Sequence, residues 1–117
     1  MSDHDPGVIA EAYFSAWLEN DWERLRGLLA DDVAFRGPLA SIDGADECVD
    51  GMRGLAKILT GIDVRKRFVD GPDVLTWFDL HTSVAPPAPT ANWSRVEDGR
   101  IMRIQVTFDP RPLAPPG

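Results

Sequence analysis

The sequence predicts an α+β domain in which three helices precede most of the strands. Apolar residues recur at helical spacing through the first half of the chain. From residue 62 onward, apolar and polar residues alternate instead, as they do in half-buried strands. The turn signals Asp70-Gly71-Pro72-Asp73 and Asp98-Gly99 join successive strands by short connections. Strands joined in this way predict a largely antiparallel sheet.

The first predicted helix begins after Asp5, whose side chain can cap it, with Pro6 at the first helical position. Its apolar face continues to Trp17, and Asn20 can end it in the left-handed conformation. Asp21 is placed to cap a second helix. The apolar face of that helix is formed by Trp22, Leu25, Leu28 and Leu29.

A short strand is predicted over residues 33–36, where Gly37-Pro38 interrupts it and a polar loop follows. The third helix is predicted over about residues 45–60. It contains Gly51 and Gly54, each of which costs about 1 kcal/mol relative to alanine inside a helix. The two glycines therefore indicate close packing or a bend in this helix.

The second half of the chain predicts four strands, over residues 62–69, 74–83, 91–97 and 100–108. Residues 85–89 contain three prolines and are predicted to form a loop, because proline cannot occupy a central strand. We expect residues 1–109 to form one domain and residues 110–117 a proline-rich C-terminal tail.

Length, charge and composition restrict the classes of function. A chain of 117 residues is long enough to bury one core, and its net charge of −7 argues against nucleic-acid binding, which needs a basic face. No apolar run approaches the ~20 residues that span a bilayer, and the N-terminus lacks the apolar core of a signal peptide. We therefore expect no membrane partner and a cytoplasmic protein. The single Cys48 excludes an intrachain disulfide and is expected to be structural and buried.

The sequence predicts neither a metal site nor a bound cofactor. It contains two histidines and one cysteine, without the spacing of metal ligands. It also has no Gly-x-Gly-x-x-Gly motif and no phosphate-binding loop.

The order of the elements implies a hollow. A strongly curved sheet wrapped over three helices would form a cone that is open at one end, and its lining would mix aromatic and isolated polar groups, as small-ligand pockets do. The outer face, on which Phe78 and Leu80 are expected, would then be apolar. We therefore predict a homodimer formed through this convex face.

The predicted strand over 74–83 carries a candidate catalytic pair. Asp79 and His81 lie two residues apart, beside Trp77, so these side chains share one face, with the two Cα atoms roughly 6.6 Å apart. If that face lines the cavity, Asp79 would orient His81 as a general base, or would itself be the base. The alternative is that Asp79 is paired with an arginine such as Arg95 or Arg103.

Residues 12–38 and 91–109 resemble the NTF2-like superfamily, and within it the SnoaL-like proteins. These segments read AYFSAWLENDWERLRGLLADDVAFRGP and ANWSRVEDGRIMRIQVTFD. The resemblance covers roughly residues 8–109. It implies an NTF2-like cone, with three N-terminal helices packed in a strongly curved, mostly antiparallel sheet. The superfamily holds cyclases, isomerases, epoxide hydrolases, dehydratases and non-catalytic binders.

Two members of the superfamily supply templates for the site. Tyr13 is similar to the helix tyrosine of ketosteroid isomerases, whose base position is occupied here by Gly37. Asn92 stands where those enzymes have a protonated acid. Polyketide cyclases of the SnoaL type have a catalytic aspartate at the position of Asn92 and a strand histidine that resembles His81.

Together these features predict a SnoaL-like enzyme that transfers protons, without a cofactor, on a small hydrophobic carbonyl compound. The reaction would be of the isomerase or cyclase type, with an oxyanion bound by hydrogen bonds. Gly37 and Asn92 favour the alternative, a non-catalytic ligand-binding or dimerisation module. The predicted catalytic residues are Asp79 and His81, and the predicted substrate-binding residues are Tyr13, Trp17, Trp77, Asn92 and Phe108.

Overall fold

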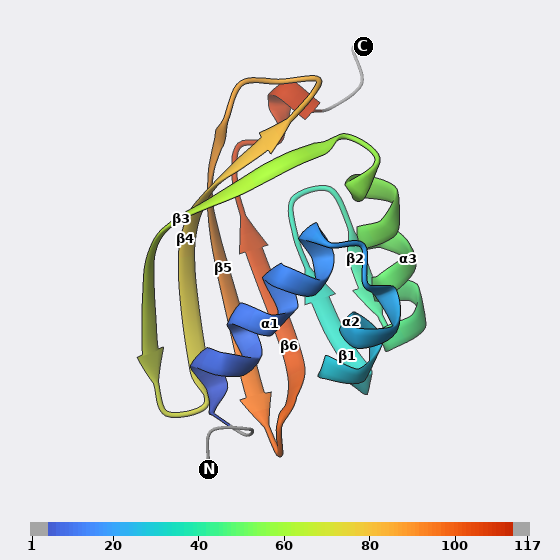
Figure 1. Ribbon diagram of the computed structural model, residues 1–117, viewed down its shortest axis with the longest axis vertical. Helices are drawn as coiled ribbons and strands as arrows, with labels where there is room; N and C mark the ends of the chain where they lie inside the picture. The colour runs from blue at the N-terminus through green and yellow to red at the C-terminus, as the bar shows by residue number, and fades with distance from the viewer. Residues whose placement is uncertain (1–4, 114–117) are drawn as a thin grey trace.

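Three helices pack on the concave face of a curved, six-stranded sheet in the computed structural model, which describes residues 5–113 (Figure 1). The strand order is β2-β1-β6-β5-β4-β3. Neighbouring strands are antiparallel except for β1 and β6, which are parallel, so the sheet is mixed. The predicted α+β fold class is confirmed.

The helices are α1 (Pro6–Leu18), α2 (Trp22–Leu28) and α3 (Ala45–Ala56), and a 3₁₀ turn covers Arg111–Leu113. The strands are β1 (Leu29–Arg36), β2 (Ser41–Asp43), β3 (Leu59–Asp70), β4 (Asp73–Thr82), β5 (Ala88–Glu97) and β6 (Arg100–Thr107). None of the helices within residues 5–113 combines the length and the apolar character needed to cross a membrane. Part of the predicted tail, residues 114–117, lies outside the described residues.

The first two helices begin as their sequences predict. The Asp5 carboxylate accepts a hydrogen bond from the Gly7 N–H at 2.9 Å, and the Asp21 carboxylate accepts one from the Arg24 N–H at 3.2 Å. Asn20, between the helices, has a φ of 57°, the left-handed conformation expected of it.

Several boundaries differ from the sequence prediction, among them the starts of β1 at Leu29 rather than residue 33 and of β3 at Leu59 rather than residue 62. The predicted polar loop contains the short strand β2, α3 ends at Ala56 rather than near residue 60, and β5 begins at Ala88 inside the proline-rich segment. Pro89 pairs with Asp79 of β4. The pairing of β5 with β6 begins only at Ala91, so the proline lies in an edge-like part of its strand, where a missing N–H is tolerated.

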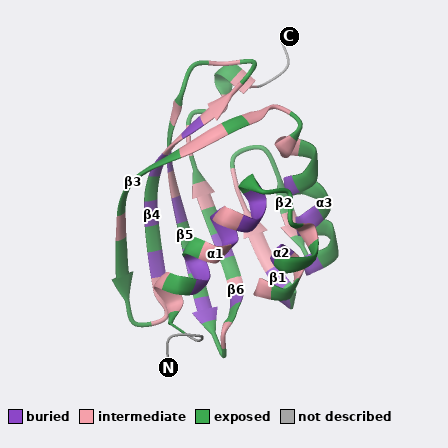
Figure 2. Ribbon diagram, in the orientation of Figure 1, coloured by how far each residue is buried: buried purple, intermediate pink, exposed green. Residues whose placement is uncertain are grey.

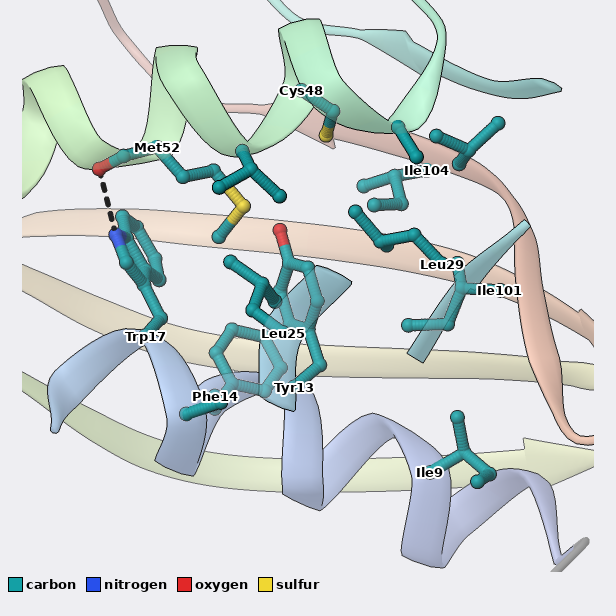
Figure 3. Close-up of a cluster of buried hydrophobic side chains, with 14 of the residues drawn as sticks. Ile9, Tyr13, Phe14, Trp17, Leu25, Leu29, Cys48, Met52, Ile101 and Ile104 are labelled. Atoms are coloured by element: carbon teal, nitrogen blue, oxygen red, sulfur yellow. Dashed lines mark hydrogen bonds between the residues drawn. The ribbon is translucent and has the colours of Figure 1, made fainter. Parts of the chain in front are cut away.

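The core lies between the concave face of the sheet and the helices. Buried and exposed residues alternate along β4 and β5 (Figure 2). Buried residues of both strands belong to the same core cluster as residues of α1. The rings of Phe14 on α1 and Phe78 on β4 pack edge to face, with centroids 5.1 Å apart. The Trp17 indole N–H donates to the Met52 carbonyl oxygen at 3.1 Å and ties α1 to α3 (Figure 3).

Irregular pairing bends the sheet around this core. The register of β3 and β4 shifts between Val64 and Lys66, and that of β5 and β6 shifts between Arg95 and Val96. Bulges of this kind increase the local twist and bend of a strand. The bent sheet leaves a hollow beside the helices instead of packing flat against them.

The prediction that Phe78 and Leu80 lie on the outer face is wrong. Both side chains are buried on the concave face and belong to the core. The sequence identified correctly which residues of β4 share a face, but the strand is turned the opposite way. Its outward set contains Asp79 and His81.

Candidate functional site

A cavity of about 350 Å³ lies between α3, the connection from β1 to β2, and the concave face of the sheet. Its volume is within the usual range of small-ligand pockets, roughly 300–1,000 Å³. The lining is almost entirely apolar. It includes Tyr13, Trp17, Phe35, Gly37, Leu39, Ile42, Cys48, Gly51, Met52, Gly54, Leu55, Ile58, Phe78, Leu80, Thr90, Asn92, Val106 and Phe108.

Two polar side chains of the cavity lining, Tyr13 and Asn92, are almost fully buried, with 2% and 3% of their surface exposed. The Tyr13 ring rises from α1, and its hydroxyl points toward α3 (Figure 3). Burial is the main cause that raises the pKa of Tyr13 well above its usual value of 10.0, and the nearby Cys48 raises it further. A hydrogen bond from the Asn92 amide lowers this pKa in part. The Tyr13 hydroxyl therefore keeps its proton at neutral pH.

Hydrogen bonds from Ser94 to Asn92 and from Asn92 to Tyr13 determine which of these side chains can donate to a ligand. The Ser94 hydroxyl donates to the Asn92 side-chain oxygen at 2.9 Å. The amide nitrogen of Asn92 is then the group that donates to the Tyr13 oxygen. With its oxygen accepting from Asn92, the Tyr13 hydroxyl has a proton to offer to a ligand acceptor.

Two further polar side chains in the lining are unreactive or already bonded. Burial raises the pKa of the Cys48 thiol to about 11, so the thiol is protonated at neutral pH and is a poor nucleophile. The Thr90 hydroxyl donates to the Ala88 carbonyl oxygen at 2.9 Å. Neither group competes with Tyr13 for a ligand.

Among residues 5–113, no Asp, Glu, His, Lys or Arg side chain lines the cavity. The same residues also contain no group of three His, Cys, Asp or Glu side chains placed to bind a metal ion. The site therefore offers hydrogen bonds and apolar surface rather than charge.

Asp79, His81 and Trp77 lie outside the cavity, so the prediction that they face it is wrong. Asp79 accepts a hydrogen bond at 2.9 Å from Nε of Arg65 on β3. The alternative prediction that Asp79 pairs with an arginine is correct, but the partner is Arg65 rather than Arg95 or Arg103. The His81 Nε2 atom lies 3.9 Å from a carboxylate oxygen of Asp63, and Trp77 is 44% exposed.

The strand register explains this arrangement. Thr76 of β4 stands opposite Asn92 of β5, and Trp77 stands opposite Ala91. Residues directly opposite each other on neighbouring strands point to the same face. Because Asn92 points inward, Thr76 must do so too, and Trp77 and Asp79 must point outward.

Four of the predicted site residues line the cavity, namely Tyr13, Trp17, Asn92 and Phe108. Their role in binding a substrate remains a prediction. Sequence reasoning missed Ser94, although its position two residues after Asn92 places it on the same face of β5. It also missed Phe35 on β1 and Ile42 on β2, and the strand β2 itself was not predicted.

Known proteins resemble this chain over most of its length. The SnoaL-like domain family matches residues 10–104. A crystallised protein from Kribbella flavida is 33% identical, with a TM-score of 0.84 over 90% of this chain and 87% of that one. A comparison with curated proteins found no match.

Two more distant structures support the fold alone. An NTF2-like protein of unknown function from Cytophaga hutchinsonii is 22% identical, with a TM-score of 0.84 over 92% of this chain and 93% of that one. A LEH-like epoxide hydrolase from M. tuberculosis is 22% identical, with a TM-score of 0.74 over 86% and 80%. These similarities confirm the predicted NTF2-like cone.

Proposed function

The chain belongs to the SnoaL-like domain family, and from this premise we propose that its cavity binds a small hydrophobic molecule that carries one hydrogen-bond acceptor, such as a ketone. One observation carries the proposal. The Tyr13 hydroxyl, beside Asn92, is a buried and protonated donor in a largely apolar cavity. A carbonyl oxygen would accept this hydrogen bond, and the apolar lining would contact the carbon skeleton.

Of the two functions expected from the sequence, the proposal corresponds to the alternative, a non-catalytic ligand-binding module. Removing a proton beside a carbonyl requires a base within hydrogen-bonding reach. In the described part of the chain, the ionisable groups of the lining are Tyr13 and Cys48, and burial raises the pKa of both. Both are therefore acids at neutral pH, and neither can accept a proton from the ligand.

The binding proposal is tested with Tyr13→Phe, which removes the hydroxyl and keeps the ring. Two ligands of similar shape are compared, the ketone camphor and the hydrocarbon camphene. A net hydrogen bond contributes about 0.5–1.5 kcal/mol, so camphor should bind roughly 2- to 12-fold more weakly to the variant. Camphene should bind both proteins equally. Isothermal titration calorimetry measures the two affinities.

Ser94→Ala provides a matched control for the hydrogen-bond chain. It leaves the Tyr13 hydroxyl in place but removes the donor that orients Asn92. Camphor should therefore lose less affinity than in Tyr13→Phe. Equal losses for camphor and camphene in Tyr13→Phe would show that the hydroxyl does not anchor the ligand, and the proposal would be abandoned.

Exchange of carbonyl-adjacent protons separates binding from catalysis. With camphor in heavy water, the proposal predicts that the wild-type protein does not accelerate deuterium incorporation above the rate in buffer. Nuclear magnetic resonance follows the exchange directly. Acceleration that disappears in Tyr13→Phe would favour the isomerase type of activity over simple binding.

The predicted homodimer has a different physical basis from the one the sequence indicated. Four apolar side chains on the outer face form a strip, which we call the outer strip. Phe68, Leu75 and Trp93 are direct neighbours across β3, β4 and β5, and Trp77 lies in the next row. The outer strip consists of Phe68, Leu75, Trp77 and Trp93, which are 43–56% exposed.

We propose that a second copy of the chain covers the outer strip. Charged residues beyond each end of it are paired within the chain: Arg65 with Asp63 and Asp79 at one end, and Arg95 with Asp73 and Glu97 at the other. A twofold rotation about the middle of the strip would bring the outer strip of each copy onto that of the other. Self-complementary surfaces of this kind are characteristic of symmetric dimers.

A further inference from the structure

We propose that Leu39, on the connection between β1 and β2, caps the mouth of the cavity and contacts the outer end of the bound ligand. This inference rests on the proposed ligand binding and adds the orientation of the ligand. The hydrogen-bond acceptor of the ligand would lie at the buried Tyr13 hydroxyl. Its apolar end would lie at the mouth, covered by Leu39.

The exposure of the lining residues locates the mouth of the cavity. Within residues 5–113, the exposed members of the lining come from two segments only, the connection 37–40 and α3. They are Pro38, Leu39, Ala40, Gly51 and Gly54, and the other lining residues are buried or half-buried. The strands β1 and β2 lie against α3 (Figure 1). The mouth is therefore the gap between the connection 37–40 and the second half of α3.

Leu39 is the one long side chain among the exposed lining residues of the described chain. The others are proline, alanine and two glycines. A Cβ atom added at Gly54 would meet no heavy atom within 4 Å, so the α3 side of the mouth is open there. Leu39 is 52% exposed and does not belong to the core cluster. Its side chain therefore faces the cavity on one side and solvent on the other.

A single exposed apolar residue on a surface is common and indicates no function by itself. Val84, between β4 and β5, is such a residue, because it is 59% exposed and lies outside the cavity lining. Leu39 differs because it also lines the cavity. A ligand that fills the cavity as far as the mouth would remove the apolar surface of Leu39 from water, which stabilises the complex and slows dissociation.

The polar groups of the lining indicate which end of the ligand lies at the mouth. The exposed lining residues carry no polar side chain. The Thr90 hydroxyl already donates to the Ala88 carbonyl oxygen, and the Tyr13 hydroxyl is a buried, protonated donor. A ligand with one acceptor would therefore pair it with Tyr13 and leave its apolar end at Leu39.

A thiol at the mouth would report whether a ligand covers it. The thiol of Leu39→Cys should react readily with a small disulfide reagent, whereas Cys48 should react slowly, because it is buried and its pKa is raised to about 11. The probes are straight-chain methyl ketones from butanone to decanone. At nine-tenths occupancy of the variant, decanone should slow the reaction about tenfold, by mass action, and butanone should leave it unchanged.

Val84→Cys is the matched control for this measurement. Its thiol would also be exposed and would lie outside the cavity lining, so no ketone should change its rate of reaction. The wild-type protein gives the background rate of Cys48.

Leu39→Ala measures the contact with the ligand. Half of the gain from burying a whole leucine, roughly 1.5–3 kcal/mol, corresponds to a loss of decanone affinity of about 4- to 12-fold. Butanone, which would not reach the mouth, should bind as it does to the wild-type protein. Leu39→Met keeps the volume and should keep the decanone affinity, as should Val84→Ala. Calorimetry measures the affinities.

The outcomes distinguish this inference from the proposed function. If decanone binds the wild-type protein through Tyr13 but neither protects Leu39→Cys nor binds Leu39→Ala more weakly, only the inference about Leu39 is overturned. An equal loss for butanone and decanone in Leu39→Ala would also overturn it, because Leu39 would then act on the shape of the connection. If the wild-type protein binds no ketone, both proposals are overturned. Thermal melting checks that each variant is folded.

Discussion

The Tyr13 hydroxyl is a donor held in an apolar environment, and its neighbours determine what it can bind. Leaving a buried polar group unpaired costs about 1–3 kcal/mol, so a ligand oxygen that pairs with it gains this free energy. Ser94 donates to the Asn92 oxygen, which leaves the Asn92 amide nitrogen to donate to Tyr13. The cavity should therefore prefer ligands with an acceptor over ligands that offer only a donor.

The buried Cys48 predicts a loss of stability at alkaline pH. Burial raises the pKa of its thiol from 9.0 to about 11, so the folded protein favours the protonated form. This contribution to stability is fully present below pH 9, the unfolded value, and is lost as the pH rises through 11. Two pKa units correspond to at most about 3 kcal/mol.

Cys48→Ala should flatten this dependence. Urea unfolding at pH 9 and at pH 11 gives the difference in the free energy of unfolding for each protein, and the difference should be smaller for the variant. The pKa of Tyr13 is also raised, mainly by burial, so some alkaline loss should remain. Equal differences in both proteins would show that Cys48 does not contribute.

At the scale of elements, two adjacent basic residues of the edge strand β3, Lys66 and Arg67, lie in different environments. Arg67 points toward the helices, where its Nε donates to the Thr76 hydroxyl at 3.0 Å and its guanidinium lies 5.6 Å from the Phe14 ring centroid. Burial is the main cause that lowers the pKa of Arg67. Lys66, its neighbour, is exposed on the outer face.

This difference predicts unequal effects of two adjacent substitutions. Arg67→Ala should destabilise the protein by about 1–3 kcal/mol, because the buried Thr76 loses its donor and Phe14 loses the cation. Lys66→Ala should change stability by less than about 0.5 kcal/mol, as is usual for surface positions. Urea denaturation measures both, and similar values would contradict the inward placement of Arg67.

At the scale of the whole molecule, the concave face is filled by helices and the cavity, while the convex face carries the outer strip. Trp77 and Trp93 are 44% and 50% exposed, an unusual position for two indole rings that lie on neighbouring strands. Their exposure in the single chain is the physical reason to expect a partner of the same kind.

The dimer is tested by placing a charge in the strip. Trp77→Glu should shift a sedimenting dimer to a monomer at micromolar concentration while the fold is retained, because Trp77 belongs to neither the core nor the cavity. Val84→Glu, at an exposed apolar residue outside the strip, should leave the dimer intact. A wild-type protein that sediments as a monomer would refute the proposal.

Local sequence was sufficient to predict much of the secondary structure. Asp5 and Asp21 start helices because a carboxylate next to free N–H groups is a local device, and it forms wherever the helix forms. The Asp98-Gly99 turn has φ values of 54° and 76°, which suit a tight hairpin. These features depend only on residues that are close in the chain, and so does the order of helices and long strands.

The sequence by itself determined which side chains of β4 share a face, because alternation is a property of the single strand. Only the tertiary structure decided which face lies inside. The pairing of Thr76 with Asn92 and the packing of Phe78 on Phe14 both join residues that are distant in sequence. These contacts bury Phe78 and Leu80 and direct Asp79 and His81 outward, so the chemistry of the cavity was settled by packing across the sheet rather than by the pattern within one strand.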